Sequence, residues 1–135
     1  EFRRVLFRSE IQYYPDGTFL AAFVDANSSQ SVLKHFDAQG RTIGQETRIS
    51  SGSGAVQMNG FCIRQDNTVL ITWNTANDVY GQIFDAGLQP VGSPTMTNTY
   101  TTNTQEYSIA RADGNGNFVV VWQSSGQDGD NGGQR

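Results

Sequence analysis

The sequence has few of the residues from which disulfide scaffolds, zinc sites and membrane spans are built. Among its 135 residues it holds one cysteine, Cys62, and one histidine, His35. One cysteine cannot form an intrachain disulfide, and one histidine cannot supply a multi-histidine zinc site. No apolar run approaches the ~20 residues that a membrane span requires. We therefore expect no membrane span in this segment, and we expect Cys62 and His35 to be packing residues.

Proline and lysine are scarce as well, and turn-forming residues are abundant. The chain has only three prolines but fifteen glycines, together with many threonine, serine, asparagine and glutamine residues. These residues punctuate strands more readily than they fill helices. Because 36% of the residues are hydrophobic, the chain can still bury a core. The composition predicts an all-β fold.

The basic residues are unevenly placed along an acidic chain. The first nine residues, EFRRVLFRS, hold three of the nine Lys and Arg residues and share no pattern with the rest of the chain. Our hypothesis is that residues 1–9 are a non-native scar, since LFRS matches a translated sequencing adapter. The alternatives are a basic phosphate-binding arm and a frayed first strand. Without these nine residues six basic residues face twelve acidic ones, so we expect no binding to nucleic acid.

Two features repeat along the chain with one period. The strings DGTFLAAF, DNTVLITW and GNGNFVVVW end at the aromatic residues Phe23, Trp73 and Trp122, which are 50 and 49 residues apart. The strings FDAQGRTIG and FDAGLQPVG begin at Phe36 and Phe84, 48 residues apart. Two independent features at one spacing indicate tandem repeats of about fifty residues.

Each repeat has the pattern of four short strands separated by turns. Its second strand is apolar at almost every position, which predicts that both of its faces are covered. Such repeats fit the blades of a β-propeller, whereas an immunoglobulin sandwich would need about 100 residues before repeating. The predicted organisation is 10–55 for the first blade, 56–107 for the second and 108–135 for a truncated third. We therefore expect about two and a half four-stranded antiparallel blades, a fragment of a longer array.

The third repeat resembles a known family. ADGNGNFVVVWQSSGQDGDNGGQR at 112–135 is similar to the tandem repeat DGxFVVVWxSxGQDGxGxGxxxQRFDAxGxPVGxE of bacterial secreted and surface proteins. Those repeats often occur in chains that also carry RTX-type calcium-binding repeats. The resemblance implies an extracellular or cell-surface location, further blades of the same chain as partners, and a surface glycan or protein as ligand. In the first two repeats Phe23 replaces the tryptophan and Asn67 replaces the turn glycine.

The repeated aromatic residues have two interpretations. In the first, Phe23, Trp73 and Trp122 fill the space between adjacent blades, and Phe36 and Phe84 have a similar structural role. In the second, the aromatic rings at 23, 73 and 122 form a platform on which a sugar stacks. A residue that recurs at the same place in every blade follows the demands of packing, so we favour the first.

The aspartates that follow Phe36 and Phe84 can also be interpreted in two ways. Asp37 and Asp85 can accept backbone N–H groups two residues on, which is an Asx turn. A catalytic carboxylate pair is the alternative, but such carboxylates must face one substrate across about 5–10 Å. Equivalent positions in successive blades seldom converge in this way, so we expect turns and no catalytic residue.

The loop SGQDGDNGG at 125–133 contains the only candidate metal ligands. Asp128, Asp130 and Asn131 offer oxygen atoms between glycines, and Ca²⁺ binds six to eight such oxygens. The loop lacks the acidic residue that closes an EF-hand. A flexible surface turn is the alternative to a calcium site. The corresponding loops of the first two repeats retain only Asp25 and Asp78.

Two functions agree with these observations. The first is a non-catalytic β-propeller segment of a secreted or cell-surface bacterial protein that acts as an interaction scaffold or adhesin-like module. The second is a blade fragment of an extracellular carbohydrate-active enzyme whose catalytic residues lie outside this segment. Arg64 and Arg111 are expected at similar places in their repeats, which favours structural roles and the first function.

Overall fold

The computed structural model describes residues 9–49 and 58–127, which form two compact units within 1–57 and 58–135. The described residues form ten β-strands and no helix, so the predicted all-β class is confirmed. No helix in this part of the chain is long and apolar enough to cross a membrane. The Asp128, Asp130 and Asn131 loop and residues 1–8 lie outside the described residues. The closure of the sheets into a propeller stays a prediction.

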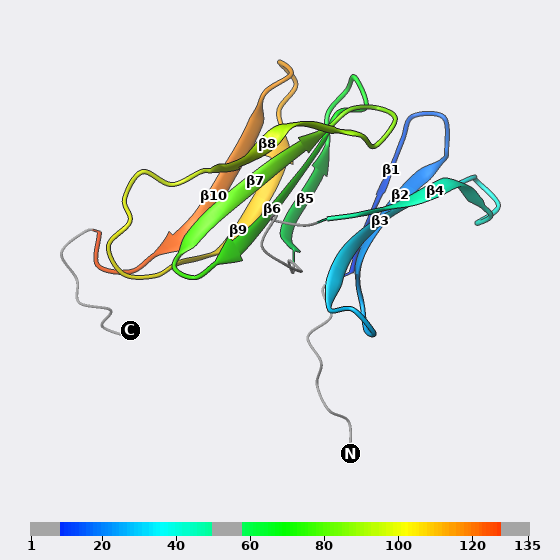
Figure 1. Cartoon of the computed structure of the whole chain (residues 1–135). Helices are drawn as coiled ribbons and strands as arrows, with labels where there is room; N and C mark the ends of the chain where they lie inside the picture. The colour runs from blue at the N-terminus through cyan, green and yellow to red at the C-terminus, as the bar shows by residue number, and fades with distance from the viewer. Residues whose placement is uncertain (1–8, 50–57, 128–135) are drawn as a thin grey trace. The chain divides into compact units, whose positions relative to one another are not determined.

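The first unit is one antiparallel sheet in the strand order β1-β2-β3-β4 (Figure 1). Each strand pairs with the next along the chain, so the sheet is a simple meander. The strands are β1 (Glu10–Tyr13), β2 (Phe19–Asp25), β3 (Gln30–Phe36) and β4 (Thr42–Arg48).

The second unit repeats this sheet and adds a hairpin. Its four-stranded sheet has the order β5-β6-β7-β8, and the hairpin pairs β9 with β10. The strands are β5 (Met58–Ile63), β6 (Val69–Thr75), β7 (Asp78–Phe84), β8 (Pro90–Met96), β9 (Gln105–Ala112) and β10 (Phe118–Ser124). Four antiparallel strands in each of the first two repeats are therefore confirmed.

The two four-stranded sheets agree in register as well as in order. Phe19 lies opposite Phe36 in the first, and Val69 lies opposite Phe84 in the second, and each pairing continues over seven residues. The fourth strand bulges at the same place in both, where Gly44 and Gly92 have φ values of 67° and 71°. Backbone with positive φ favours glycine, which explains why both sheets use it there.

Five hairpin connections share one hydrogen-bonded turn. In each, the first N–H donates to the carbonyl four residues on, and the N–H three residues on donates back to the carbonyl of the first. The fourth residue always has positive φ. The first residues are Tyr14, Asp37, Arg64, Asp85 and Asp113, and the fourth residues are Gly17, Gly40, Asn67, Leu88 and Gly116.

The shared turn corrects the expected equivalence of the two arginines. Arg64 and Asp113 open the same turn, so Arg111, two residues earlier, lies at the position of Cys62. The expectation that Arg64 and Arg111 are equivalent is wrong, because the third turn begins with an aspartate where the second begins with an arginine. Arg64 instead joins the sheet to the hairpin: its Nη1 donates to the Gly116 carbonyl at 3.1 Å, and its guanidinium lies 5.1 Å from the Phe118 ring centre.

The hairpin packs on the sheet through β9, which contacts β5 and β6, and through Phe118 and Val120 of β10. Cys62, Leu70 and Ala110 form the apolar part of this contact. The Thr72 and Ser108 hydroxyls lie 2.9 Å apart and satisfy each other in the buried interface. A Cβ on Gly60 would lie 2.8 Å from the Ala110 nitrogen and 2.4 Å from Thr72 Oγ1. Only glycine at position 60 lets the two layers approach this closely.

Burial differs among the three second strands. In β6 the five residues from Val69 to Trp73 are all buried, as the continuous apolar run predicted. In β2 buried and half-buried residues alternate, and in β10 half-buried and exposed residues alternate. Val119 and Val121 are 48% and 57% exposed. The prediction of two covered faces is therefore confirmed for β6 and wrong for β2, because apolar content alone does not determine which faces are covered. In β10, which belongs to the truncated third repeat, one face is exposed in the described structure.

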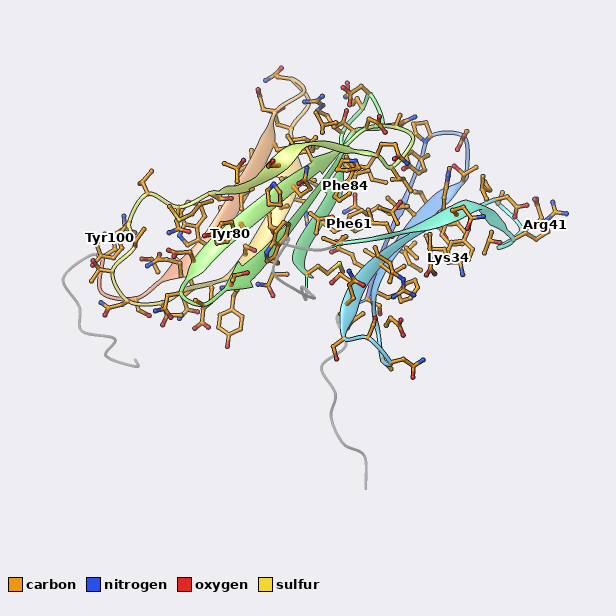
Figure 2. All side chains as sticks on the ribbon, viewed as in Figure 1. Lys34, Arg41, Phe61, Tyr80, Phe84 and Tyr100 are labelled. Atoms are coloured by element: carbon orange, nitrogen blue, oxygen red, sulfur yellow. The ribbon has the colours of Figure 1, made fainter. Side chains whose placement is uncertain are left out.

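The loop from residue 97 to 104 is held by buried amide side chains. Asn98 accepts the Val79 N–H at 2.7 Å and donates to Asp78 Oδ1 at 2.8 Å. Gln105, which is fully buried, receives the Trp122 indole N–H at 3.2 Å. Figure 2 shows Tyr100 within this loop, and its hydroxyl donates to the Gly126 carbonyl at 3.3 Å. These bonds fix the connection between β8 and β9.

Candidate interaction surface

The aspartates singled out from the sequence accept backbone N–H groups inside the turns. Asp37 Oδ1 accepts from the nitrogens of Gln39 and Arg41, both at 2.9 Å. Asp85 Oδ1 accepts from the nitrogens of Gly87 and Gln89, also at 2.9 Å. This is the geometry of an Asx turn. Figure 2 shows Arg41 at the tip of the β3–β4 hairpin, where its Nε also contacts Asp37 Oδ2 at 2.7 Å.

Other turn aspartates are occupied in the same manner. Asp113 Oδ1 accepts from the nitrogens of Asn115 and Asn117 at 2.9 and 2.8 Å. Where the turn opens with another residue, the aspartate stands two positions later: Asp16 accepts the Thr18 N–H and hydroxyl, and Asp66 accepts the Thr68 N–H. The aspartate thus stands at different positions in different turns, but in each turn its carboxylate accepts backbone N–H groups.

These hydrogen bonds favour the charged carboxylate. The backbone N–H of Arg41 lowers the pKa of Asp37, and the Asn117 side chain and N–H lower the pKa of Asp113. The Arg64 guanidinium at 2.6 Å is the main cause that lowers the pKa of Asp66. A general acid for neutral pH needs a raised carboxyl pKa. Carboxylates with lowered pKa and occupied lone pairs are suited to holding turns.

The aspartates of the β2–β3 and β6–β7 connections are also engaged. The Asp25 carboxylate accepts from the Asn27 N–H, the Ser28 hydroxyl and Arg48 Nη1, each at 3.0 Å. The Asn27 N–H and the Arg48 guanidinium lower the pKa of Asp25. Asp78 accepts the Asn98 amide. Within 9–49 and 58–127, no three His, Cys, Asp or Glu side chains gather in a group that could hold a metal ion.

The calcium prediction falls on Asp128, Asp130 and Asn131, outside the described residues, and it stays a prediction.

The repeated aromatic residues are described and differ in accessibility. Trp73 is fully buried and lies parallel to Tyr80, with ring centres 6.4 Å apart. Its Nε1 has no hydrogen-bond partner among the described atoms.

Phe23 and Trp122 are half-buried at the places equivalent to Trp73. Phe84 is buried, and half-buried Phe36 stacks on Phe19 with ring centres 5.0 Å apart. An indole that no solvent reaches cannot be a sugar platform at position 73. The three residues therefore do not present one repeated aromatic surface.

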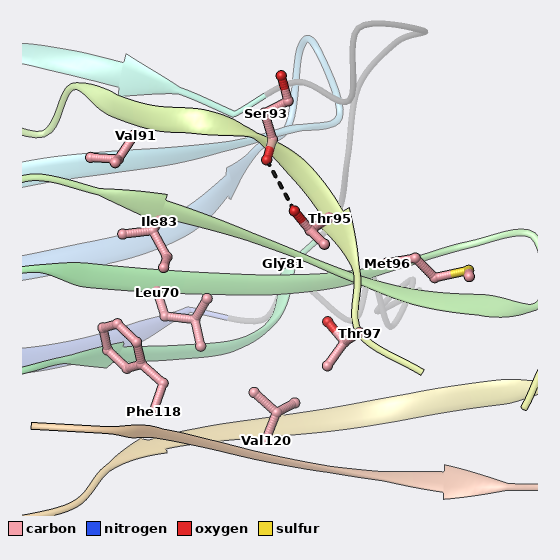
Figure 3. A pocket seen from close by; sticks show the side chains of 10 residues that line it. All are labelled: Leu70, Gly81, Ile83, Val91, Ser93, Thr95, Met96, Thr97, Phe118 and Val120. Carbon is pink, nitrogen blue, oxygen red and sulfur yellow. Dashed lines mark hydrogen bonds between the residues drawn. The ribbon is translucent and has the colours of Figure 1, made fainter. Parts of the chain in front are cut away.

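An apolar groove, which the sequence did not indicate, lies in the second unit between the outer strands of the sheet and the hairpin (Figure 3). Its volume is about 300 Å³. Figure 3 shows Phe118 and Val120 of β10 facing Leu70 and Ile83 across it. The main apolar lining residues are Leu70, Ile83, Val91, Met96, Phe118 and Val120.

The groove is partly open to solvent and uncharged. Ile83, Val91 and Met96 are 37%, 53% and 42% exposed. Its polar lining consists of the short side chains of Ser93, Thr95 and Thr97, and none of the lining residues is ionisable. It can therefore bury an apolar group but supplies no acid, base or charged nucleophile.

A second hollow follows the outer edge of β10. It has a volume of about 420 Å³ and is lined by Val120, Val121, Trp122, Ser124 and Gln127. The Ser124 hydroxyl is buried and has no hydrogen-bond partner within the described part of the chain. No described strand pairs with this edge of β10. We name the groove, this hollow and the free strand edge together the β10 surface.

No protein-family model matches the chain, and a search of curated proteins found no match. The geometry of the turns and of the β10 surface is therefore the basis on which function is inferred.

Proposed function

We propose that this chain is a non-catalytic segment of a β-propeller repeat array that acts as an interaction scaffold. The observation that carries the proposal is the identical pairing of the second, third and fourth strands in the two four-stranded sheets, down to the glycine bulge in the fourth strand. The repeated side chains of this fold set the strand register and the turns, which is typical of repeats that stack on one another. Propeller blades are the arrangement of four-stranded repeats that suits this length.

The contact inside the second unit supports the stacking. The β9–β10 hairpin covers the β5–β6 face through Ala110, Ser108 and the close approach at Gly60. Because β9 and β10 repeat the first two strands of the sheet on which they pack, this contact is one between successive repeats. An array built by such contacts grows by adding similar layers.

The proposed location is a bacterial cell surface or the extracellular space, and the proposed ligand is a surface glycan or protein. The resemblance of residues 112–135 to repeats of secreted and surface proteins supports the location. The uncharged β10 surface supports binding over catalysis, because it brings no ionisable side chain to a bound molecule.

The test combines stability with activity on the same variants. In the whole chain, Asp37→Ala and Asp85→Ala remove turn acceptors, so we expect each to lower the urea midpoint of unfolding. Sugar release from a panel of polysaccharides should stay at the no-protein background for wild type and variants. Release by the wild-type chain that either substitution abolishes without unfolding the protein would overturn the proposal and support the alternative in which Asp37 and Asp85 are catalytic carboxylates.

A further inference from the structure

We propose that Asn115, in the β9–β10 turn, is a site of spontaneous covalent modification at which the side-chain amide is converted to aspartate and isoaspartate. The inference does not depend on the proposed function, because it rests on the chemistry of one turn. That turn is closed by the Asp113 N–H, which donates to the Asn117 carbonyl at 2.9 Å. Gly116, the residue after Asn115, has a φ of 84°.

The reaction joins the Asn115 side chain to the backbone nitrogen of Gly116. This nitrogen gives up its proton to solvent and attacks Asn115 Cγ, so that an N–C bond forms. The bond from Cγ to Nδ2 breaks, and Nδ2 takes a proton from solvent and leaves as ammonia. Water then opens the resulting succinimide: attack at the side-chain carbonyl gives aspartate, and attack at the backbone carbonyl gives isoaspartate. Glycine hinders the first step least, because it has no Cβ.

Both reacting groups are accessible in this turn. Asn115 is exposed, and its side-chain amide makes no hydrogen bond to the residues that the structure describes. The Gly116 N–H donates to the Asp113 carbonyl at 3.5 Å, whereas the same bond measures 2.9 to 3.1 Å in the other four turns. A bond of 3.5 Å is weak. The nitrogen that must react is therefore held less firmly than its equivalents.

The place of the turn within the repeat keeps it exposed. The equivalent third residues of the turns in the first two repeats, Asp16 and Asp66, are exposed as well. In the second unit the β9–β10 hairpin packs on the sheet that carries Asp66, and Asp66 stays exposed beside it. We therefore expect Asn115 to stay accessible whether or not a further repeat packs on the hairpin.

The same pair of residues occurs at Asn59–Gly60 in different surroundings. Asn59 is half-buried in β5, and its Nδ2 donates to Asn74 Oδ1. Gly60 is buried, and a Cβ there would lie 2.8 Å from the Ala110 nitrogen, so little room is left for the backbone rotation that the ring requires. Reaction at Asn59 needs the strand to open, whereas a turn opens at a much smaller cost in free energy.

The two products differ in their effect on the turn. Aspartate already stands at the third position in the first two repeats, as Asp16 and Asp66, so the backbone of this turn accommodates the aspartyl product. Isoaspartate adds a methylene group to the main chain directly before Gly116, whose carbonyl accepts from Arg64 Nη1 at 3.1 Å. Because that bond joins the hairpin to the sheet, isoaspartate should loosen the contact between successive repeats.

The test follows the asparagines of the folded whole chain during incubation at mildly alkaline pH. Mass spectrometry of proteolytic peptides detects the replacement of NH₂ by OH, and fragment ions assign it to Asn59, Asn115 or Asn131, the last of which lies outside the described residues. An endoprotease that cuts before aspartate but not before isoaspartate distinguishes the products. We expect Asn115 to convert at least about tenfold faster than Asn59, with isoaspartate among its products.

Two variants serve as controls. Asn115→Gln should abolish the change at this position, because glutamine would have to close a larger and less favourable ring. Asn115→Asp carries the charge of the products without the lengthened main chain. Hydrogen exchange along Phe118–Ser124 should therefore be faster in chains that contain isoaspartate at 115 than in Asn115→Asp.

Three results would overturn the inference. The site is wrong if Asn115 stays unchanged in the folded chain while a peptide with the sequence of residues 112–118 converts. The role of the turn is wrong if Asn59 and Asn115 convert at equal rates while the β5 amides stay protected from exchange. The loosened contact is wrong if the isoaspartyl chain and Asn115→Asp exchange alike. The scaffold proposal is tested separately, through the turn variants and the sugar-release assay.

Discussion

The sheets β1–β4 and β5–β8 share strand order, register and bulge, yet their second strands have different surroundings. β6 is buried at every position from Val69 to Trp73, whereas β2 alternates and carries two alanines, Ala21 and Ala22, at its centre. The backbone pairing is therefore common to both repeats, whereas the burial of the side chains depends on what each sheet packs against. Register and packing are separate properties of a repeat.

One position shows this separation clearly. Glu10 lies opposite Ala22, Gly60 lies opposite Thr72, and Ile109 lies opposite Val121. These are equivalent places in the first strand of each repeat. The glycine occurs where a hairpin approaches to within contact of the backbone, and the exposed isoleucine occurs where no described layer covers it.

The largest effect we expect is from the aromatic residue of the second strand. Trp73→Ala should destabilise the second unit by about 3–5 kcal/mol, because a fully buried indole is lost. Phe23→Ala, the matched change in the first unit, should cost only about 1–2 kcal/mol because Phe23 is half-buried. Urea unfolding of both variants, followed at probes in each unit, measures the difference. Equal losses would show that the two strands are covered alike.

The next effect is steric. Gly60→Ala adds a Cβ that would lie 2.4 Å from Thr72 Oγ1 and 2.8 Å from the Ala110 nitrogen. We expect a loss of about 1–3 kcal/mol in the second unit, and loss of protection from hydrogen exchange along β9. Glu10→Ala is the control and should change stability by less than about 0.5 kcal/mol. An unchanged β9 in Gly60→Ala would contradict the close approach of the two layers.

A smaller, stabilising effect is expected in the connections. Ala76 in the β6–β7 loop and Ser29 in the β2–β3 loop both have φ of 54°. Glycine adopts such φ values without the penalty that other residues meet. Ala76→Gly and Ser29→Gly should each raise stability by up to about 1 kcal/mol in thermal unfolding. Destabilisation by either variant would show that the side chain stabilises its loop by more than the positive φ destabilises it.

The smallest effect that we expect, counted for each aspartate, is the loss of stability at acid pH. Carboxylates with lowered pKa in the folded state contribute stability that is complete above the unfolded pKa, near 4, and is lost as pH falls through the folded pKa. The first unit has three such groups, Asp16, Asp25 and Asp37, and the second has Asp66 and Asp113. Unfolding midpoints measured from about pH 5 to about pH 2 should fall in both units.

The control for this acid response is Asp37→Ala, which should flatten the profile of the first unit alone. A profile of the first unit that is equally steep with and without Asp37 would show that the turn carboxylate is not the cause.

The sequence permitted the strands, the period and the turns to be predicted because these depend on local residues. The aromatic spacing located β2, β6 and β10, and glycine and aspartate located the hairpins. The groove could not be predicted, since Leu70, Val91 and Phe118 belong to three strands and meet only through the packing of the hairpin. The equivalence of Arg64 with Asp113 was missed for a related reason: a turn is defined by its hydrogen bonds, and different residues can open it.

The glycine bulges also limit the number of strands in each sheet. Between Ile43 and Thr47, and between Val91 and Thr95, the fourth strand carries two residues more than its partner. Such an irregular strand is a poor template for a fifth, which is how natural sheets avoid aggregation at their edges. In the β9–β10 hairpin the extra residue belongs to β9, so β10 stays regular. Among β4, β8 and β10, aggregation should therefore begin at β10, and a proline or lysine there should improve solubility more than at β4 or β8.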